Sequence, residues 1–278
     1  MSKETEFQKK YGPWAFIAGA SEGIGQAYAH QLAERGLNLI TCARRIEPLE
    51  ADAKILRARY GVQVQPVAMD LASPDLASDF ERALGAHDVG LLIYNACFST
   101  IKPFVDASLA EHHKTIDVNC RGPLVLAQIM AKRLLARPLH SGSRGGILLM
   151  SSMSGFQGSA MVSSYAATKG FNTILAEGLW AELDPQGVDV MTCVAGATLT
   201  PGFESNTPQD KQKQVFPMTA EAVACAGLNG LGRHKPVVIA GGMNRFVNAF
   251  SALMTRRQRT AFFSSQTQKV YAKKANLL

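Results

Sequence analysis

Short apolar runs alternate with amphipathic stretches along most of the 278-residue chain. The apolar runs predict buried strands near residues 14–19, 37–43, 62–69, 89–95, 145–151, 187–194 and 236–240. Apolar positions at helical spacing predict helices near residues 23–35, 47–60, 74–86, 106–137, 163–184 and 219–231. Because strands and helices alternate, we expect an α/β fold: a doubly wound parallel sheet of about seven strands with helices on both faces.

The chain is predicted to form a single domain over residues 1–278, with a core of about residues 12–242 and a C-terminal helical extension of about residues 243–278. The extension has one apolar face at helical spacing, formed by Phe246, Val247, Phe250, Leu253 and Met254. Residues 222–278 contain nine Lys and Arg and no Asp or Glu; the last six of these cations are Arg256, Arg257, Arg259, Lys269, Lys273 and Lys274. Two interpretations stay open: packing on the core or a partner subunit, or peripheral contact with an anionic lipid surface or an acyl-CoA phosphate.

Composition excludes several classes of protein. Hydrophobic residues make up 47% and charged residues 18% of the chain, enough for a sizeable core. The N-terminal run MSKETEFQKK is polar, and no segment approaches the ~20 apolar residues that span a bilayer, so we expect a soluble, cytoplasmic protein. The five cysteines lack metal-ligand spacing, which predicts reduced thiols and no metal site, and no nucleic-acid-binding motif accompanies the basic charge.

A glycine-rich segment follows the first predicted strand. Gly19, Gly23 and Gly25 form a G-x-x-x-G-x-G pattern between the apolar run WAFIA and a helical pattern. Glycines let the backbone approach a pyrophosphate closely, and the N-terminus of the next helix offers free N–H groups and a positive dipole end. The order of strand, glycine turn and helix predicts a dinucleotide site, against the alternative of an ordinary glycine-rich turn.

Tyr165 and Lys169 lie four residues apart in YAATK, which places them one turn apart on the same face of a helix. A tyrosine phenol titrates near ~10, and a neighbouring ammonium favours the phenolate, so we predict a lowered pKa for Tyr165. A tyrosine of this kind can protonate an alkoxide or deprotonate an alcohol. The alternative for an isolated Tyr-x-x-x-Lys is a surface pair.

These motifs, in this order, resemble the short-chain dehydrogenase/reductase family over about residues 12–242. The three glycines match the family's glycine motif, and Asp70, after VQPVAM, matches the acidic residue that contacts the adenine. Asn95 in YNAC matches the segment that closes the fourth strand of the family. The resemblance implies a Rossmann-type sheet.

The resemblance also implies a catalytic tetrad. Asn119 in DVNCRG matches the helix asparagine, and Ser152 lies thirteen residues before Tyr165, which is the family spacing. Tyr165 would exchange the proton, while Lys169 would lower its pKa and hold the nicotinamide ribose. Ser152 would hydrogen-bond the substrate oxygen, and Asn119 would hold a water that links Lys169 to solvent. Taken singly, Ser152 could merely cap a turn and Asn119 could be a helix-interior polar residue.

A third group of residues is expected beside the nicotinamide. Gly196 and Thr200 resemble the family segment Pro-Gly-x-x-x-Thr, although Ala195 replaces its proline. Tyr94 and Cys97 also depart from the strand-four motif, and Cys97 is expected near the nicotinamide. The residues predicted to bind the cofactor are Gly19, Ser21, Gly23, Ile24, Gly25, Arg44, Arg45, Asp70, Leu71, Asn95, Ala96, Tyr165, Lys169, Gly196, Thr198 and Thr200.

The end of the second predicted strand bears on the choice of cofactor. Arg44 and Arg45 follow that strand, where a carboxylate would bind ribose hydroxyls and an arginine would accommodate a 2′-phosphate. We therefore favour NADP(H) over NAD(H), against the alternative of two solvated loop charges. Glu22 in the glycine segment argues the other way, since it could pair with Arg44 or weaken phosphate binding.

The segments SEGIG, TCARR, VNCRGP and LWAEL are similar to the branch of hydroxysteroid dehydrogenases and very-long-chain 3-oxoacyl-CoA reductases. The resemblance implies hydride transfer between NADP(H) and a carbonyl/alcohol pair, on a lipophilic ketone, steroid or 3-oxoacyl substrate. Candidate pocket residues are Phe98, Met153, Phe156, Met161 and Phe203, with simple packing as the alternative. The resemblance also implies a homodimer or homotetramer, and a lid over residues 198–219 that is mobile until cofactor binds. A catalytically silent nucleotide-sensing or scaffold protein that binds a partner through the basic extension is the alternative function.

Overall fold

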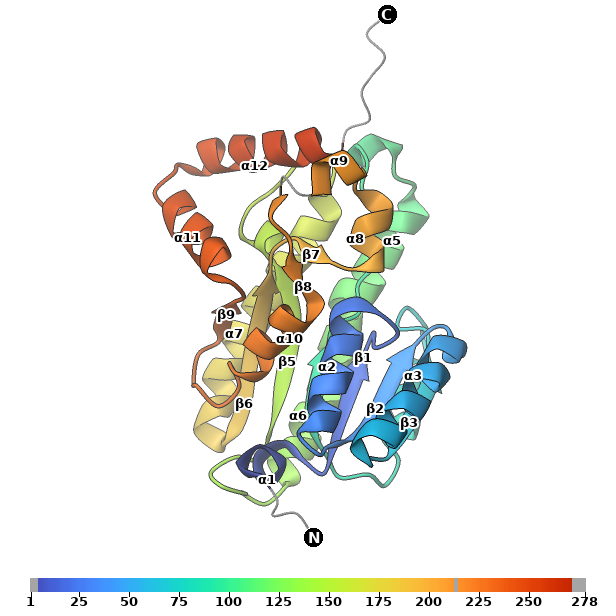
Figure 1. Cartoon of the computed structure of the whole chain (residues 1–278). Coiled ribbons are helices and arrows are strands. Elements are labelled where there is room, and N and C mark those ends of the chain that lie inside the picture. Colours follow the sequence, from blue (N-terminus) through green and yellow to red (C-terminus); the bar gives the residue numbers. More distant parts are fainter. Residues whose placement is uncertain (1–4, 213–214, 272–278) are drawn as a thin grey trace, which may run out of the picture.

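The computed structural model describes residues 5–212 and 215–271. Seven strands form one sheet in the order β3–β2–β1–β4–β5–β6–β9, and every neighbouring pair is parallel (Figure 1). In chain order these strands are β1 (Trp14–Ala18), β2 (Asn38–Ala43), β3 (Val64–Ala68), β4 (Val89–Tyr94), β5 (Gly145–Ser152), β6 (Val188–Ala195) and β9 (Val237–Ile239). The predicted doubly wound parallel sheet is confirmed.

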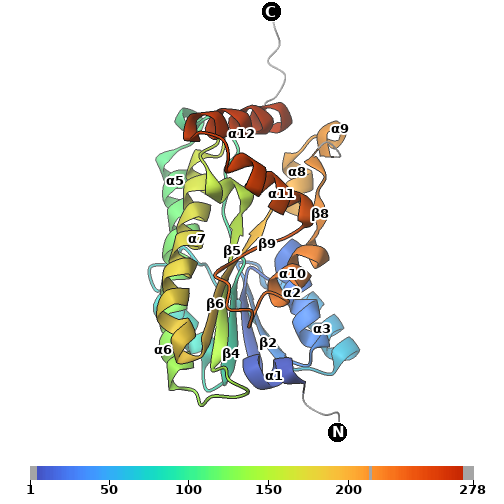
Figure 2. The same cartoon turned by 90° about the vertical axis from the view of Figure 1, so that its left-hand side faces the viewer.

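Helices cover both faces of the sheet because successive strand residues point to opposite sides (Figure 2). In β1, Ala15 and Ile17 belong to one buried cluster, whereas Phe16 belongs to the other. The first cluster is closed by α2 (Gly23–Glu34), α3 (Ile46–Tyr60) and α10 (Ala220–Leu228). The second is closed by α4 (Leu76–Leu84), α6 (Gly122–Ala136) and α7 (Ser163–Leu183).

The strand order fixes where a ligand can bind. β1 lies between β2 and β4, so the chain moves outward in one direction through β2 and β3 and in the other from β4 onward. At this switch point the loops after β1 and β4 diverge and leave a crevice at the carboxyl ends of the strands. Among the described residues, no helix combines the length and apolar character that a membrane span needs.

Two predicted helices differ from the structure. The single helix predicted over residues 106–137 is divided into a 3-10 turn at Phe104–Asp106, α5 (Leu109–Ile116), a π-helical turn at Asp117–Arg121, and α6. The extension holds two helices rather than one, α11 (Gly242–Ser251) and α12 (Arg256–Tyr271), and Leu253 and Met254 lie in the turn between them. Lys273 and Lys274 lie outside the described residues.

The smaller elements include α1 (Glu6–Tyr11), α8 (Pro201–Asn206), α9 (Gln209–Gln212) and the parallel pair of β7 (Thr198–Leu199) and β8 (Met218–Thr219). The segment predicted as a lid thus folds as β7, α8, α9 and β8. Helix α12 passes over the carboxyl end of the sheet, beside α9 and above β7 in Figure 1.

Candidate active site

The glycine segment forms a tight turn between β1 and α2. Gly19 has a φ of +82°, and a Cβ atom there would lie 2.6 Å from Ala96 Cα. A Cβ on Gly25 would lie 1.8 Å from the Gly19 carbonyl oxygen, so the first turn of α2 packs directly on the preceding turn. Glu22, at the N-cap, makes no side-chain hydrogen bond to the helix. The N-terminus of α2 is therefore free to bind an anion.

Asn95, directly after β4, holds this turn in place. Its Nδ2 donates to the Gly19 carbonyl at 2.8 Å, and its own backbone N–H donates to Ala18 at 3.0 Å. Asn95 and Ala96 then line the pocket beside the glycine turn. The carboxamide therefore joins the two strand ends at the switch point.

Arg44 and Arg45 lie exposed at the pocket edge after β2. Arg45 Nη2 lies 3.7 Å from Glu22 Oε2, so the pairing predicted for Arg44 is made by its neighbour. The separation is long and both side chains are at least half exposed, at 69% and 50%, so the ion pair is weak. Asp70 lies on the same side of the pocket, and its Oδ1 accepts the Ala72 N–H at 3.0 Å.

The π-helical turn positions Asn119, which is fully buried. Its Oδ1 accepts the Phe98 N–H and its Nδ2 donates to the Phe98 carbonyl, both at 2.8 Å. Nδ2 also contacts Thr168 Oγ1 at 3.0 Å. The Asn119 side chain thus connects the loop after β4 to α7. It does not line the pocket.

Tyr94 is a positioning residue that sequence reasoning treated only as a departure from the family motif. It is buried, and its hydroxyl donates to the Val118 carbonyl at 2.5 Å, inside the π-helical turn. A Cβ on Gly122 would lie 2.1 Å from that hydroxyl, so a glycine is needed there. The sequence held one signal for this contact: a large residue at position 94 together with a glycine at position 122.

Ser152, Tyr165 and Lys169 come together in the pocket from β5 and α7. Lys169 Nζ lies 5.6 Å from the centre of the Tyr165 ring and donates to the Met150 carbonyl at 3.1 Å. Ser152 Oγ accepts the Ser154 N–H at 3.2 Å, so the serine also caps a turn. The predicted spacing of the tyrosine and lysine on one helix face is confirmed.

The pKa of Tyr165 is raised rather than lowered. Burial is the largest cause, the nearby Cys97 thiol adds to it, and a hydrogen bond with Ser152 acts in the opposite direction. Burial also lowers the pKa of Lys169. Desolvation of the phenol, rather than the neighbouring lysine, therefore decides the direction of the pKa shift, which keeps Tyr165 protonated and able to donate a proton.

The remaining predicted residues follow β6. Gly196 packs against α11, since a Cβ there would lie 2.5 Å from Asn244 Oδ1. Thr198 Oγ1 donates to the Gly196 carbonyl at 3.1 Å, and Thr200 caps α8 by accepting the Phe203 N–H at 3.1 Å. Gly196, Thr198 and Thr200 all line the pocket.

These groups enclose one pocket of about 780 Å³, within the ~300–1,000 Å³ of small-molecule and cofactor sites. The predicted residues that line it are Gly19, Ser21, Gly23, Ile24, Arg44, Arg45, Asp70, Leu71, Asn95, Ala96, Ser152, Tyr165, Lys169, Gly196, Thr198 and Thr200. Gly25 and Asn119 are buried beside it instead. Cys97, expected near the nicotinamide, is exposed and lines the pocket.

The apolar wall was predicted in part. Phe98, Met153 and Phe203 line the pocket, but Phe156 and Met161 do not. Phe156 lies beneath the Arg259 guanidinium, 5.9 Å from its ring centre, and Met161 occupies a left-handed turn with φ of 65°. The lining residues that sequence reasoning missed include Lys114 of α5 and five residues of α12: Phe263, Gln266, Thr267, Val270 and Tyr271.

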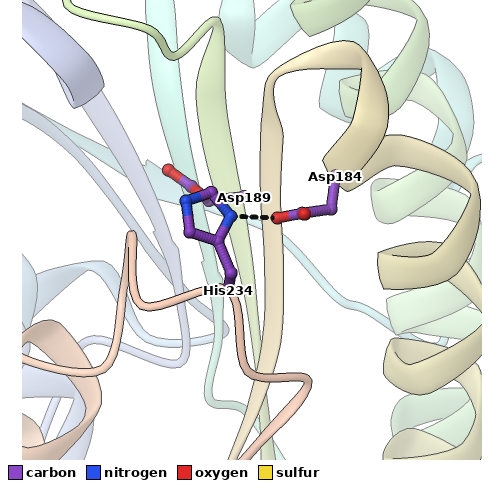
Figure 3. A group of neighbouring side chains, drawn as sticks. All are labelled: Asp184, Asp189 and His234. Atoms are coloured by element: carbon purple, nitrogen blue, oxygen red, sulfur yellow. Dashed lines mark hydrogen bonds and ion pairs between the residues drawn. The ribbon is translucent and has the colours of Figure 1, made fainter.

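A second polar group lies at the amino end of the sheet, away from the pocket (Figure 3). Asp184 Oδ1 and His234 Nδ1 are 2.8 Å apart, which raises the pKa of His234. Asp189 already accepts the Tyr11 hydroxyl at 2.7 Å and the Ser143 hydroxyl at 3.2 Å. These contacts tie the start of β6 to the segments around it and identify no ligand.

The chain belongs to the short chain dehydrogenases: the model of that family matches residues 13–211. It is accordingly an oxidoreductase with a nicotinamide-binding fold. Among curated relatives, 7beta-hydroxysteroid dehydrogenase of Clostridium sardiniense is 32% identical over 86% of this chain and 89% of its own length. A very-long-chain 3-oxoacyl-CoA reductase of Podospora anserina is 35% identical over 67% of this chain and 55% of its own length.

Solved structures agree with this assignment. One from a study of 7beta-hydroxysteroid dehydrogenase stereoselectivity has a TM-score of 0.84 and 30% identity, over 93% of this chain and 99% of the other. A short-chain dehydrogenase from Sphingobium yanoikuyae in complex with NADPH has a TM-score of 0.72 and 29% identity, over 96% of this chain and 99% of the other. The predicted family and branch are confirmed.

Proposed function

We propose that the protein transfers hydride between NADP(H) and a carbonyl/secondary alcohol pair of a bulky lipophilic substrate such as a hydroxysteroid. The observation that carries this proposal is that Ser152, Tyr165 and Lys169 share one pocket with the glycine turn. The matching relatives named as 7beta-hydroxysteroid dehydrogenases support a steroid over a 3-oxoacyl thioester, since they match along most of both chains.

The residues present fit a phosphorylated dinucleotide. The uncapped N-terminus of α2 and the glycine turn suit the pyrophosphate, and Asp70 lies where an adenine-binding acid is expected. Arg44 and Arg45 offer two guanidinium groups at the end of β2, where a 2′-phosphate would lie. The acid beside them, Glu22, is held loosely by Arg45.

The bound dinucleotide supplies the hydride for ketone reduction. The Tyr165 hydroxyl gives its proton to the substrate oxygen as the carbonyl becomes an alcohol, and the same group takes the proton back in oxidation. Ser152 Oγ hydrogen-bonds that oxygen where negative charge develops. Lys169, buried behind the tyrosine, stabilises the phenolate left after proton transfer.

Oxidation of NADPH by steroid ketones, 3-oxoacyl-CoA and small ketones tests the proposal, with Tyr165→Phe as the matched variant. We expect the wild type to reduce the steroid ketone, and Tyr165→Phe to lose at least ~100-fold in kcat while binding NADPH normally. If neither protein reduced any ketone while both bound NADPH, the alternative of a catalytically silent nucleotide-sensing or scaffold protein would be favoured. Preferential reduction of 3-oxoacyl-CoA would move the substrate to that class.

Cofactor choice has its own test, by titration with NADPH and NADH. We expect NADPH to bind more tightly, and Arg44→Ala to reduce that preference by roughly tenfold, since a charge-assisted phosphate contact is lost. Glu22→Gln is the complementary variant and should strengthen NADPH binding. Tighter binding of NADH by the wild type would contradict the proposal.

We also propose a homo-oligomer that covers the apolar face of α5–α7. Ile116, Leu124, Phe171 and Ile174 are large apolar residues that are between 36% and 67% exposed on these neighbouring helices. Such a surface is typical of an interface between subunits. Light scattering should give a mass above 29.9 kDa for the wild type, and Ile174→Lys should lower it. A monomeric wild type would overturn this assembly.

The extension offers a separate surface for an anionic membrane. Met243, Phe246, Phe250 and Leu253 are 56% to 85% exposed, and Arg256 lies exposed beside them. Apolar and basic side chains together suit an anionic lipid surface. Sedimentation with phosphatidylserine vesicles should capture the wild type more than Phe246→Ser. Equal capture by phosphatidylcholine, or none, would refute the contact; a fall in oligomer mass for Phe246→Ser would assign this face to a partner subunit.

A further inference from the structure

The turn that follows β3 contains Asp70, the residue matched to an adenine-binding acid. Asp70 Oδ1 accepts the Ala72 N–H at 3.0 Å, and the Asp70 carbonyl accepts the Ser73 N–H at 2.9 Å. Asp70 and Leu71 line the pocket, whereas Ala72 and Ser73 do not. The position of the Asp70 carboxylate therefore depends on where the backbone of Ala72 and Ser73 is held.

Arg121, at the end of the π-helical turn, holds that backbone. Its Nη2 donates to the Ala72 carbonyl at 2.7 Å and to the Ser73 carbonyl at 2.9 Å. Its Nε donates to Asp117 Oδ1 at 3.1 Å, one turn earlier in the same segment. A guanidinium is planar and its donors are fixed relative to one another, so the bond to Asp117 orients the group toward the two carbonyls.

The π-helical turn thus contacts two separate parts of the pocket wall. Asn119, in the middle of the turn, bonds the backbone of Phe98 in the loop after β4, and Val118 lines the pocket. Arg121 does not line the pocket. Any effect of Arg121 on a ligand must therefore act through the turn that contains Asp70.

We propose that Arg121 is a positioning residue for the adenine half of the cofactor. It fixes the Asp70 turn in its binding conformation before the ligand arrives, so less conformational freedom is lost when the adenine binds. The π-helical turn then serves both ends of the site, the adenine end through Arg121 and the loop after β4 through Asn119. This inference rests on the proposed NADP(H) binding and does not depend on which ketone is reduced.

Arg133 supplies the matched control. It lies on α6, and its Nη2 donates to the Gly85 carbonyl in the loop after α4 at 3.0 Å. Neither Arg133 nor Gly85 lines the pocket. Arg133→Leu therefore removes a bond of the same kind, from an arginine to the backbone of a loop, without touching the Asp70 turn.

Calorimetry with two ligands tests the role: NADPH, and adenosine 2′,5′-bisphosphate, which represents the adenine half alone. Arg121→Leu should weaken the binding of both ligands by the same factor, roughly tenfold, because the charged donor to both carbonyls is lost. Arg121→Lys keeps the charge without the forked donors and should lie between Arg121→Leu and the wild type. Arg133→Leu should bind both ligands within about twofold of the wild type. In steady-state assays, Arg121→Leu should raise KM for NADPH and keep kcat within about threefold.

Unchanged binding by Arg121→Leu would overturn the proposal, and so would weaker binding of NADPH with normal binding of the bisphosphate. Equal losses in Arg133→Leu would also overturn it. If circular dichroism shows that Arg121→Leu is unfolded, Arg121→Lys decides: weaker binding of the bisphosphate supports the role, and wild-type binding refutes it. A wild type that binds neither ligand would overturn the proposed cofactor together with this role. A wild type that binds NADPH but reduces no ketone would overturn the proposed reaction alone, and the two affinities would still decide the role of Arg121.

Discussion

Gly25→Ala tests whether the glycine turn is built for close packing beneath the cofactor. The new Cβ would lie 1.8 Å from the Gly19 carbonyl oxygen and 2.6 Å from Asn95 Nδ2, both far inside van der Waals contact. The Gly19 oxygen is the acceptor of the Asn95 carboxamide, so the methyl group must displace the bond that joins β1 to β4. The first turn of α2 and the loop after β4 would separate.

The expected change in the free energy of unfolding follows from two opposing effects. Overpacking costs about 1–3 kcal/mol or more, while alanine gains about 1 kcal/mol over glycine within a helix. Gly178 supplies the matched control, because it lies in α7 and a methyl group added there would have no atom within 4 Å. Gly178→Ala should therefore raise Tm by ~2–4 °C, whereas Gly25→Ala should lower it.

Thermal unfolding and NADPH titration give the two readouts. Gly25→Ala should bind NADPH at least ~10-fold more weakly, since the turn proposed to receive the pyrophosphate is displaced, and Gly178→Ala should bind it normally. A Gly25→Ala protein with wild-type NADPH affinity and an increased Tm would refute the packing argument.

Three further predictions concern charge and thiol chemistry. The pKa of Glu111 is lowered from 4.5 to about 2, mainly by a hydrogen bond with Lys102. The ionised carboxylate therefore contributes fully to the stability of the fold above pH 4.5, and this contribution is lost as the pH falls toward 2. Urea midpoints across that range should fall less for Glu111→Gln than for the wild type; parallel curves would contradict the assignment. Arg137→Leu should lower the free energy of unfolding by about 2–4 kcal/mol in urea titrations, because Asp88 and two backbone carbonyls lose their donor; a change below the error of the fit would argue against it. Iodoacetamide should alkylate Cys97 and block NADPH binding, since this exposed thiol lines the pocket, and NADPH should protect it; equal loss in Cys97→Ala would show that another thiol is responsible.

The local sequence pattern was sufficient to predict the sheet and most of the residues that line the candidate site. The strands are continuous apolar runs because both faces of a parallel sheet are buried, as in β4, where every residue is buried. The order of strand, glycine turn and helix, and the placement of Tyr165 and Lys169 on one helix face, are set by residues close in the sequence, so their spacing predicted them; the contact of the turn with Asn95 is not local. The order of the strands then brought these local motifs to one edge of the sheet.

Features that depend on distant contacts were not predictable in this way. The division of the 106–137 helix involves a hydrogen bond from Tyr94 to Val118, a pairing that no local periodicity reveals. The pKa of Tyr165 was predicted from the nearby lysine, but burial by the rest of the fold decides its direction. The pocket face of α12 mixes Phe263 and Val270 with polar residues, so it has no apolar stripe to detect.

The absence of buried residues along the described length of α12 has an evolutionary consequence. Replacements on a helix outside the core carry a small folding penalty, whereas replacements at Asn95 or Asn119 would dismantle contacts between strand ends. Sequence changes are therefore expected to be tolerated more readily along this helix than at the strand ends that form the pocket floor.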